Sequence, residues 1–395
     1  MADRGPWETY SHDAMVLANA FDCRIEDLTR PQQCPQFLNA DPNRRTCNWY
    51  IPSFTNPFYG GVMTILRIAA YLQDIGRIRQ RFLVCGPVDG AQIAELIAKP
   101  FPVLREAEVI VLNSRRAIAE IPRADYSFAT LWTTAYIVLK VRNTAHKFYL
   151  IQDFEPLFYP AGSTYAQAEL TYRFGFYGIA NTQEIKRIYE SQYGGRAHTL
   201  VPQVDPAVFF PRRQPLPNSP KRIFWYARPG TPRNGFELAA GAFSRLKQKF
   251  GSAVDIVCAG ADWDPKPYGL ESIVTNLGLL SYEQTGDLYR SCHIGLTMMM
   301  TKHPSYLPLE LMACGCLVVA NDNPANAWLL MSGTNSLLAP PTVSAIAETL
   351  GRAVEDYDNL LSLRENARQD VLARSSWETE LAGVLAFLNH PPKLS

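Results

Sequence analysis

The sequence lacks long runs of one charge and long apolar runs. No block of Lys and Arg is longer than a pair such as Arg44-Arg45, and the formal net charge is only +1. This argues against a nucleic-acid-binding surface, which would need clustered positive charge. The start of the chain has acidic residues and no apolar signal segment, and prolines and glycines interrupt the uncharged residues 46–66. We therefore expect a cytoplasmic protein, neither secreted nor carrying a transmembrane helix.

Cysteine pairs and several well-known motifs are also missing. The eight cysteines include no C-x-x-C pair, which argues against a disulfide framework and against most zinc sites. Cys314 and Cys316 flank Gly315, but only His303 lies near them in sequence, so we expect reduced thiols and no metal. No G-x-G-x-x-G or G-x-S-x-G follows an apolar run, which excludes dehydrogenases and hydrolases of those types.

The sequence does contain the alternating pattern of an α/β protein. Of its 395 residues, 47% are hydrophobic and 19% are charged, which is enough for two globular domains. Short apolar runs such as NWYIP and KFYLIQD alternate with segments of helical period, as in α/β units on a parallel sheet. A Pro-rich stretch, residues 211–222, interrupts the alternation and predicts the interdomain linker. We predict two Rossmann-like domains, with an arm before them and a helix after them: residues 1–46, 47–212, 213–375 and 376–395.

Open α/β sheets bind ligands where strands end and helices begin, and the first two such junctions carry candidate residues. After NWYIP, Gly60-Gly61 opens a helix and would let an anion approach bare backbone; the alternative is a tight turn with positive φ. After RIFWYAR, Arg228 and Arg233 would clamp a diphosphate; the alternative is two solvated arginines. Phe236-Glu237 stands where a Walker A loop requires Lys-Ser/Thr, so that loop is excluded.

The third junction is TKHPSYLPLELMACGC, residues 301–316, which places Glu310 in the first turn of a helix beside Pro308. A carboxylate is favoured there by the helix dipole, and this is the structural interpretation. The functional interpretation is that its two oxygens bind the hydroxyls of a sugar, such as the ribose of a nucleotide. Spacing alone leaves both open.

Three stretches of the sequence resemble a known family. HPSYLPLELMACGCLVVA resembles the helix-and-strand signature of GT-B glycosyltransferases of the family 4 type. Together with WYIPSFTNPFYGGVMTILRIAAYL and FYLIQDFEPLFYPAGSTYAQAELTYRFGFYGIANT, it resembles the bacterial rhamnan and surface-layer glycan rhamnosyltransferases of that superfamily. The resemblance covers most of the chain. It implies two Rossmann-like domains facing a central cleft, with a C-terminal helix that crosses back to the N-terminal domain.

The resemblance also implies roles for the residues at these junctions. Arg228 and Arg233 would bind the donor diphosphate, Glu310 would hold the ribose, and Gly60-Gly61 would close over the phosphate and sugar. Many relatives have a glutamate eight positions before the one at Glu310, where this chain has Lys302, a residue that could meet the phosphates. Three further residues of the same motif are expected to contact the donor: His303, Ser305 and Tyr306.

The activity that this resemblance implies is transfer of a sugar from a nucleotide-sugar donor. The sugar would be L-rhamnose from dTDP-L-rhamnose, moved with retention to a surface polysaccharide or a lipid-linked glycan, without a cofactor or a metal. Arg228, Arg233 and Lys302 would stabilise the departing diphosphate. Glu310 by itself does not distinguish dTDP from UDP or GDP, because each leaves it a hydroxyl. A lipid-linked acceptor would bring the protein to the inner face of a membrane, and a homodimer is left open.

Two further hypotheses and two alternatives complete the sequence interpretation. Asp153 and Glu155 in QDFEP follow a strand, and we hypothesise that they contact the acceptor; the alternative is that they cap a helix or a turn. Asp262-Trp263-Asp264 matches the metal-binding motif of GT-A transferases, although a whole α/β domain precedes it. A non-catalytic nucleotide-sugar-binding or assembly subunit is the other alternative, because Lys302 departs from the usual glutamate.

Overall fold

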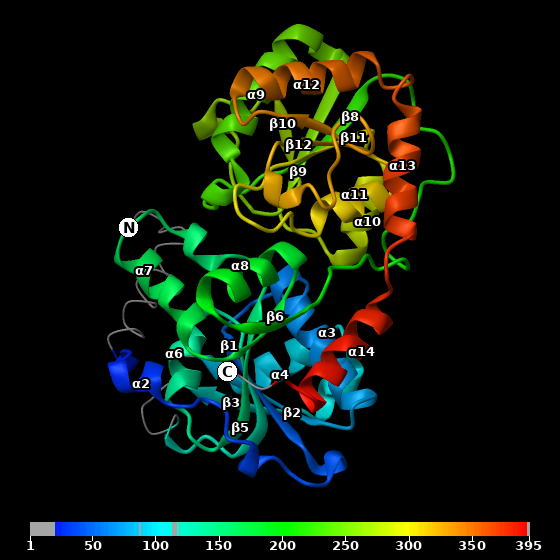
Figure 1. Ribbon diagram of the computed structural model, residues 1–395. Coiled ribbons are helices and arrows are strands. Elements are labelled where there is room, and N and C mark those ends of the chain that lie inside the picture. Colours follow the sequence, from blue (N-terminus) through cyan, green and yellow to red (C-terminus); the bar gives the residue numbers. More distant parts are fainter. Residues whose placement is uncertain (1–19, 87, 113–116, 118, 393–395) are drawn as a thin grey trace. The chain divides into compact units, whose positions relative to one another are not determined.

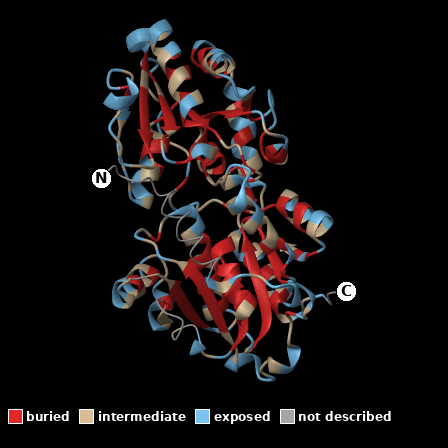
Figure 2. Ribbon diagram, turned by 90° about the vertical axis from the view of Figure 1, so that its left-hand side faces the viewer, coloured by how far each residue is buried: buried red, intermediate tan, exposed pale blue. Residues whose placement is uncertain are grey.

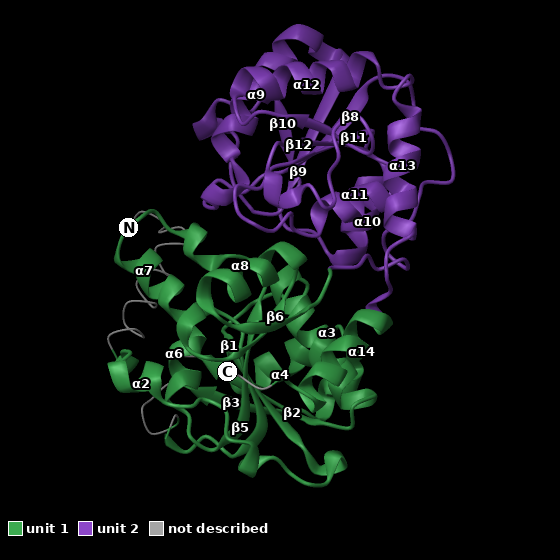
Figure 3. Ribbon diagram, in the orientation of Figure 1, with its two compact units in different colours: residues 1–201, 378–395 green, residues 202–377 purple. Residues whose placement is uncertain are grey.

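The computed structural model describes residues 20–86, 88–112, 117 and 119–392, and the chain divides into two compact units (Figure 3). Unit 1 comprises residues 1–201 and 378–395, and unit 2 comprises residues 202–377. The backbone therefore passes between the units twice, after Val201 and after Trp377. Each unit has its own parallel sheet and its own hydrophobic core.

Unit 1 is built on a seven-stranded parallel sheet in the order β3-β2-β1-β4-β5-β6-β7 (Figure 1). Its central strands are buried on both faces, as Figure 2 shows, which explains why they read as apolar runs rather than alternating patterns. The chain builds outward from β1 to β3 and then returns to β4, so that β1 and β4 adjoin at the topological switch point. The strands are β1 Thr46–Pro52, β2 Arg79–Cys85, β3 Glu108–Leu112, β4 Ala124–Ala129, β5 Thr144–Ile151, β6 Tyr177–Ala180 and β7 Arg196–Thr199.

The helices of unit 1 begin and end at recognisable signals. Helix α8 starts after Thr182, whose side chain accepts a hydrogen bond from the Ile185 N–H, and ends at Gly194 in the left-handed conformation. Over the described ranges, no helix combines the length and the apolarity needed to cross a bilayer. The α-helices are α2 Ile25–Thr29, α3 Gly60–Asp74, α4 Gly90–Ala98, α6 Trp132–Lys140, α7 Ser163–Leu170 and α8 Gln183–Tyr193.

The C-terminal helix α14, Trp377–Asn389, packs on unit 1 although it follows unit 2 in sequence (Figure 3). Its apolar stripe, Leu381, Val384 and Leu388, is buried. The Phe387 ring lies 6.2 Å from the Phe148 ring on β5, centroid to centroid. The helix that was expected to cross back to the N-terminal domain is therefore confirmed.

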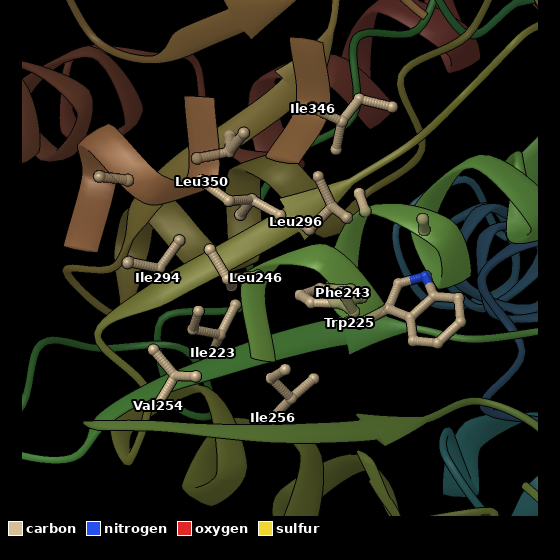
Figure 4. Close-up of a cluster of buried hydrophobic side chains, with 14 of the residues drawn as sticks. Ile223, Trp225, Phe243, Leu246, Val254, Ile256, Ile294, Leu296, Ile346 and Leu350 are labelled. Atoms are coloured by element: carbon tan, nitrogen blue, oxygen red, sulfur yellow. The ribbon is translucent and has the colours of Figure 1, made fainter. Parts of the chain in front are cut away.

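Unit 2 repeats the same architecture with a six-stranded parallel sheet in the order β10-β9-β8-β11-β12-β13. Its switch point lies between the adjoining strands β8 and β11. Trp225, Phe243 and Leu350 belong to a cluster of buried side chains that joins this sheet to helices α9 and α12 (Figure 4). The strands are β8 Lys221–Tyr226, β9 Val254–Ala259, β10 Val274–Asn276, β11 Ile294–Thr297, β12 Leu317–Asn321 and β13 Leu337–Ala339. The helices are α9 Phe236–Phe250, α10 Tyr282–Arg290, α11 Leu307–Ala313, α12 Val343–Glu355 and α13 Leu361–Leu372.

The Pro-rich stretch that predicted the linker lies within unit 2, and the chain changes unit earlier, at Val201. Arg212 holds this stretch in place. Its Nη1 donates to the Cys292 carbonyl at 3.1 Å and its Nη2 donates to the Gly315 carbonyl at 2.7 Å. These carbonyls follow helices α10 and α11, where helix ends leave acceptors without a partner in the helix. The proline content predicts that the stretch is neither helix nor strand, but it does not reveal that Arg212 anchors it to unit 2.

The described part of the N-terminal arm packs on unit 1. The Cys34 N–H donates to the Ala145 carbonyl on β5 at 2.7 Å. On the same strand, Lys147 Nζ donates to Gln32 Oε1 at 2.9 Å, and burial lowers the lysine pKa to about 7. Residues 32–34 therefore form part of the body of unit 1.

Candidate functional site

In unit 2 the candidate residues follow the two strands of the switch point, β8 and β11. The loop after β8 carries Arg228 and Arg233, and the loop after β11 leads through Lys302 to α11. The two loops are in contact, since the Met300 N–H donates to the Arg233 carbonyl at 2.9 Å. Gly235 makes this approach possible: its φ is +58°, and an added Cβ would lie 2.8 Å from Met300 Cε. The structure thus brings Arg233 and the residues before Lys302 together.

Arg228 is half-buried beside the end of β8 and has no acidic partner. Its Nη1 donates to the Tyr226 hydroxyl at 3.4 Å, and its guanidinium lies 5.8 Å from the centre of the Tyr226 ring. Among the described residues, no ion pair involves Arg228. A partly buried guanidinium without a carboxylate is well suited to an anionic ligand, because its donors remain available in a fixed fork.

Glu310 lies in the first turn of α11, after Pro308, as the sequence predicted. Within the described ranges, no hydrogen bond or ion pair reaches its carboxyl group. Burial raises its pKa to about 8, far above the ordinary 4.5. At neutral pH the group therefore carries a proton, and it can both donate to and accept from the hydroxyls of a ligand.

His303 and Ser305 shape the loop between β11 and α11. His303 is buried, and its Nδ1 accepts a hydrogen bond from the Ser305 N–H at 2.9 Å. Ser305 has a φ of +67°, in the left-handed region that favours glycine. Burial lowers the pKa of His303 to about 4, so the ring is neutral, its proton lies on Nε2, and this buried atom has no hydrogen-bond partner. The Tyr306 ring lies 6.4 Å from the His303 ring.

In unit 1 the glycine pair stands at the start of α3, and both residues are exposed. Neither has a positive φ, so the alternative explanation, a turn that requires glycine, is wrong. Gln152, which follows β5, donates from Nε2 to the Gly61 carbonyl at 3.2 Å, and a Cβ on Gly61 would lie 3.4 Å from that nitrogen. The pair therefore leaves bare backbone beside the end of β5, next to Asp153.

The two carboxyl groups of QDFEP are placed differently. Glu155 is 2% exposed, and its Oε2 accepts hydrogen bonds from the Trp132 N–H at 2.6 Å and the Tyr149 hydroxyl at 3.0 Å. Trp132 is the first residue of α6, so Glu155 caps that helix. Asp153 is 8% exposed and its Oδ1 accepts from the Phe154 N–H at 2.7 Å. Burial raises the pKa of Glu155 to about 8.

The D-x-D motif of the GT-A alternative has a local structural role. Asp264 Oδ1 accepts from the Lys266 N–H at 3.0 Å and so begins the turn of residues 266–268. Among the described residues, no group of three or more His, Cys, Asp or Glu side chains is arranged to hold a metal ion. Cys314 and Cys316 are both buried thiols in the core of unit 2.

Two further functional candidates, Asn321 and Asn323, are not predicted from the sequence. They stand at the end of β12 and hydrogen-bond the backbone that leads to Lys302. A signal was available, because polar residues directly follow the apolar run LVVA. Their partners lie about twenty residues away, which local sequence does not reveal.

Comparisons with known proteins agree with this architecture. Two domain models match, WsaF N-terminal domain over residues 47–183 and WsaF C-terminal domain over residues 221–351. The O-antigen biosynthesis protein RfbC of Myxococcus xanthus is 43% identical over 353 residues, which is 89% of this chain. The chain spans only 27% of the length of that relative.

Two solved structures share the fold at low sequence identity. HepE of Anabaena, solved with UDP and glucose, has a TM-score of 0.67 at 17% identity, covering 88% of this chain and all of HepE. Sucrose-phosphate synthase of Thermosynechococcus elongatus has a TM-score of 0.63 at 13% identity, covering 87% of this chain and 98% of the synthase. At these identities the likeness concerns the fold.

Proposed function

Because the chain belongs to the GT-B glycosyltransferases, we propose that it transfers a sugar from a nucleoside-diphosphate donor to a glycan during surface polysaccharide synthesis. The WsaF domain matches and the similarity to an O-antigen biosynthesis protein support this class of acceptor. The structures of HepE with UDP and with UDP-glucose support a nucleoside-diphosphate donor. Unit 2 is the proposed donor-binding unit.

The observation that carries the proposal is the state of Glu310. Its carboxyl group is half-buried, burial raises its pKa to about 8, and no described residue hydrogen-bonds to it. A carboxyl group that is partly exposed and has no protein partner can exchange hydrogen bonds with a ligand. The hydroxyl groups of a nucleoside sugar would provide such partners.

The cations of the adjoining loops would stabilise the leaving group. In the proposed reaction the bond from the anomeric carbon to the diphosphate breaks and its electrons remain on the diphosphate. The acceptor oxygen forms the new bond as its proton passes to an oxygen of the departing diphosphate. Arg228, Arg233 and Lys302 are positioned on the loops at the switch point, where negative charge would develop. Retention of anomeric configuration is part of the proposal, following the family resemblance.

L-Rhamnose, from dTDP-L-rhamnose, is the proposed donor sugar. Its support is the resemblance of the sequence motifs to surface-layer glycan rhamnosyltransferases, the activity associated with WsaF. UDP- and GDP-sugars are the competing donors. The assay below separates them.

Unit 1 is the proposed acceptor-binding unit. Asp153, at the end of β5, and Glu155 are the proposed contacts for the acceptor, although the carboxyl group of Glu155 also accepts hydrogen bonds from the start of α6 and from Tyr149. The bare backbone at Gly60-Gly61 is a proposed contact for the donor phosphate. A lipid-linked acceptor, a cytoplasmic location and contact with the inner face of the membrane belong to the same proposal.

The test is ligand-dependent thermal stability of the purified protein with dTDP, UDP, GDP and ADP. A ligand at 100 times its dissociation constant should stabilise the fold by about 2.7 kcal/mol. We expect one of the pyrimidine or guanine diphosphates to stabilise the wild type and to lose most of its effect in Glu310→Ala. Glu283→Ala is the matched control, because Glu283 also lies in a first turn but is exposed.

Transfer is then measured with the stabilising nucleotide carrying a labelled sugar. Labelled product with dTDP-rhamnose supports the proposed donor, and product only with a UDP- or GDP-sugar keeps the enzyme class and discards rhamnose. Binding without product under any donor supports the non-catalytic subunit. No stabilisation by any diphosphate would leave Glu310 as a helix-terminal acid and overturn the proposal.

A further inference from the structure

Two asparagines at the end of β12 hold the segment that leads from β11 to Lys302. Asn321 forms a two-way bridge with Met299: its Oδ1 accepts from the Met299 N–H at 2.8 Å, and its Nδ2 donates to the Met299 carbonyl at 3.0 Å. Asn323 Nδ2 donates to the same carbonyl at 3.1 Å and to the Thr301 carbonyl at 2.7 Å. Asn321 is 3% exposed, so water competes little for these bonds.

The loop after β8 holds the other side of this segment. The Met300 N–H donates to the Arg233 carbonyl at 2.9 Å, and Asn234 Nδ2 lies 3.5 Å from the Met298 carbonyl. Each residue from Met298 to Thr301 therefore has a backbone group bonded to one of the two neighbouring loops. Residues 298–301 and their hydrogen bonds thus form a short backbone frame that links Arg233 to Lys302.

The chemistry of these contacts requires amides. Asn321 and Asn323 both use the oxygen and the nitrogen, because Asn323 Oδ1 also accepts from the Ala325 N–H at 3.1 Å and starts the 3-10 turn Pro324–Asn326. An aspartate would keep the acceptor contacts. It would replace each donor by an oxygen facing a carbonyl oxygen, and two such oxygens repel.

We propose that Asn321 and Asn323 are positioning residues, which set the spacing of Arg233 and Lys302 for the diphosphate of the donor. The inference rests on the proposed function of unit 2 and extends it to residues that touch no ligand. Arginine and lysine side chains bind phosphate oxygens only over short distances. Loosening the frame that joins their backbones therefore lowers affinity for the diphosphate more than affinity for the nucleoside.

The experiment compares Asn323→Asp and Asn321→Asp with Asn335→Asp. Asn335 is a control from the same unit: its Oδ1 accepts from the Met331 N–H at 2.8 Å, and its Nδ2 donates to the Leu329 carbonyl at 2.9 Å and to Asp370 Oδ2 at 2.7 Å. Because its aspartate variant also faces a carboxylate, it is the more severe test of a purely structural loss. Binding of UDP and dTDP is measured by calorimetry, and binding of uridine and thymidine by nuclear magnetic resonance. All three variants are expected to lose thermal stability.

The expected result is selective. In Asn323→Asp, which loses two donated hydrogen bonds, affinity for the diphosphate falls about tenfold while affinity for the nucleoside stays within twofold. Asn321→Asp, which loses one donated bond to a carbonyl and a weak one to the Met300 sulfur, shows a smaller loss of the same kind, and Asn335→Asp keeps both affinities. Asn323→Ala, which also removes the cap on Ala325, loses no less diphosphate affinity than Asn323→Asp.

Four outcomes would overturn the inference. If Asn323→Asp binds the diphosphate like the wild type, the asparagine does not position the cations. If diphosphate and nucleoside affinities fall together, or if Asn335→Asp shows the same loss, the role is structural. A wild-type protein that binds no nucleoside diphosphate overturns the proposed function and this inference with it, and so is distinguished from a failure of the inference alone.

Discussion

Glu155 in unit 1 and Glu310 in unit 2 are two carboxyl groups whose pKa is raised by the same amount but whose hydrogen bonds differ. Each follows a strand of a parallel sheet, and burial raises the pKa of each to about 8. The Glu155 carboxyl accepts two hydrogen bonds from its own unit, whereas no described residue hydrogen-bonds to the Glu310 carboxyl, which is half-buried. A raised pKa therefore marks burial in both, and only the missing partner distinguishes a candidate ligand contact from a helix cap.

The largest expected effect is a fall in stability with rising pH, which follows from the raised pKa that the two carboxyl groups share. Both are protonated in the folded protein up to about pH 8, but ionise near 4.5 in the unfolded chain. Their contribution to the free energy of unfolding is fully present below pH 4.5 and is lost as the pH rises through 8. From pH 6.5 to 8 each carboxyl should cost about 2 kcal/mol of stability, or about 4 kcal/mol for the pair. Urea unfolding across this range measures it.

The double variant Glu155→Gln/Glu310→Gln should remove most of this fall, because glutamine does not titrate. The pKa values of His293 and His303 are lowered to about 4, so their contribution changes between pH 4 and 6.5, below the window. Lys147, whose pKa is lowered to about 7, raises stability within the window and partly offsets the fall, so the difference between wild type and double variant is what isolates the carboxyls. Glu283→Gln, at an exposed position, is the control. Parallel stability curves for wild type and double variant would show that the carboxyls are ionised in the folded protein.

The next largest effect is a loss of stability that we expect for substitution of Glu155 but not of Glu310. Glu155→Ala should lower the free energy of unfolding by about 3 kcal/mol, because the Trp132 N–H and the Tyr149 hydroxyl lose their acceptor in a buried site. Glu155→Gln should recover most of that loss at pH 7. Denaturant unfolding provides the measurement. An unchanged midpoint for Glu155→Ala would show that the Glu155 cap of α6 does not stabilise the fold.

Glu310→Ala should show the opposite pattern. It removes no bond within the described protein, so stability should stay within about 0.5 kcal/mol of wild type. The affinity for UDP or GDP, whose ribose has two free hydroxyls, should fall by about 2 kcal/mol, roughly thirtyfold. The fall should be about half as large in free energy for dTDP, whose sugar has one. Calorimetric titration tests this. A Glu310→Ala variant that is destabilised like Glu155→Ala, and still binds the nucleotide, would make the two groups equivalent caps.

The smallest effect is expected at Asp153, next to Glu155 in sequence. Asp153→Asn keeps an oxygen for the Phe154 N–H and removes the charge. We expect the KM for the acceptor to rise about threefold with the KM for the donor unchanged, as for the weakening of one hydrogen bond. Initial rates against each substrate measure the difference. Unchanged acceptor dependence would leave the QDFEP segment with a structural role only.

The sequence alone was sufficient for the architecture and for the local position of Glu310. Apolar runs such as KFYLIQD are long enough to identify buried parallel strands, and the proline before Glu310 marks the first turn of α11. Both are local properties, because periodicity and helix-start preferences act over a few residues. The resemblance of the motifs to GT-B enzymes also predicted that the C-terminal helix α14 packs on unit 1.

Tertiary structure decided which polar side chains already have partners. Glu155 caps α6 from 23 residues away, Asn323 binds Thr301 across 22 residues, and Arg212 ties the Pro-rich stretch to Gly315 across 103. No local pattern encodes such pairs, since each joins segments that are neighbours in the folded unit but are separated in sequence. Whether a buried polar group is satisfied by the protein or left for a ligand is therefore settled only when the chain is folded.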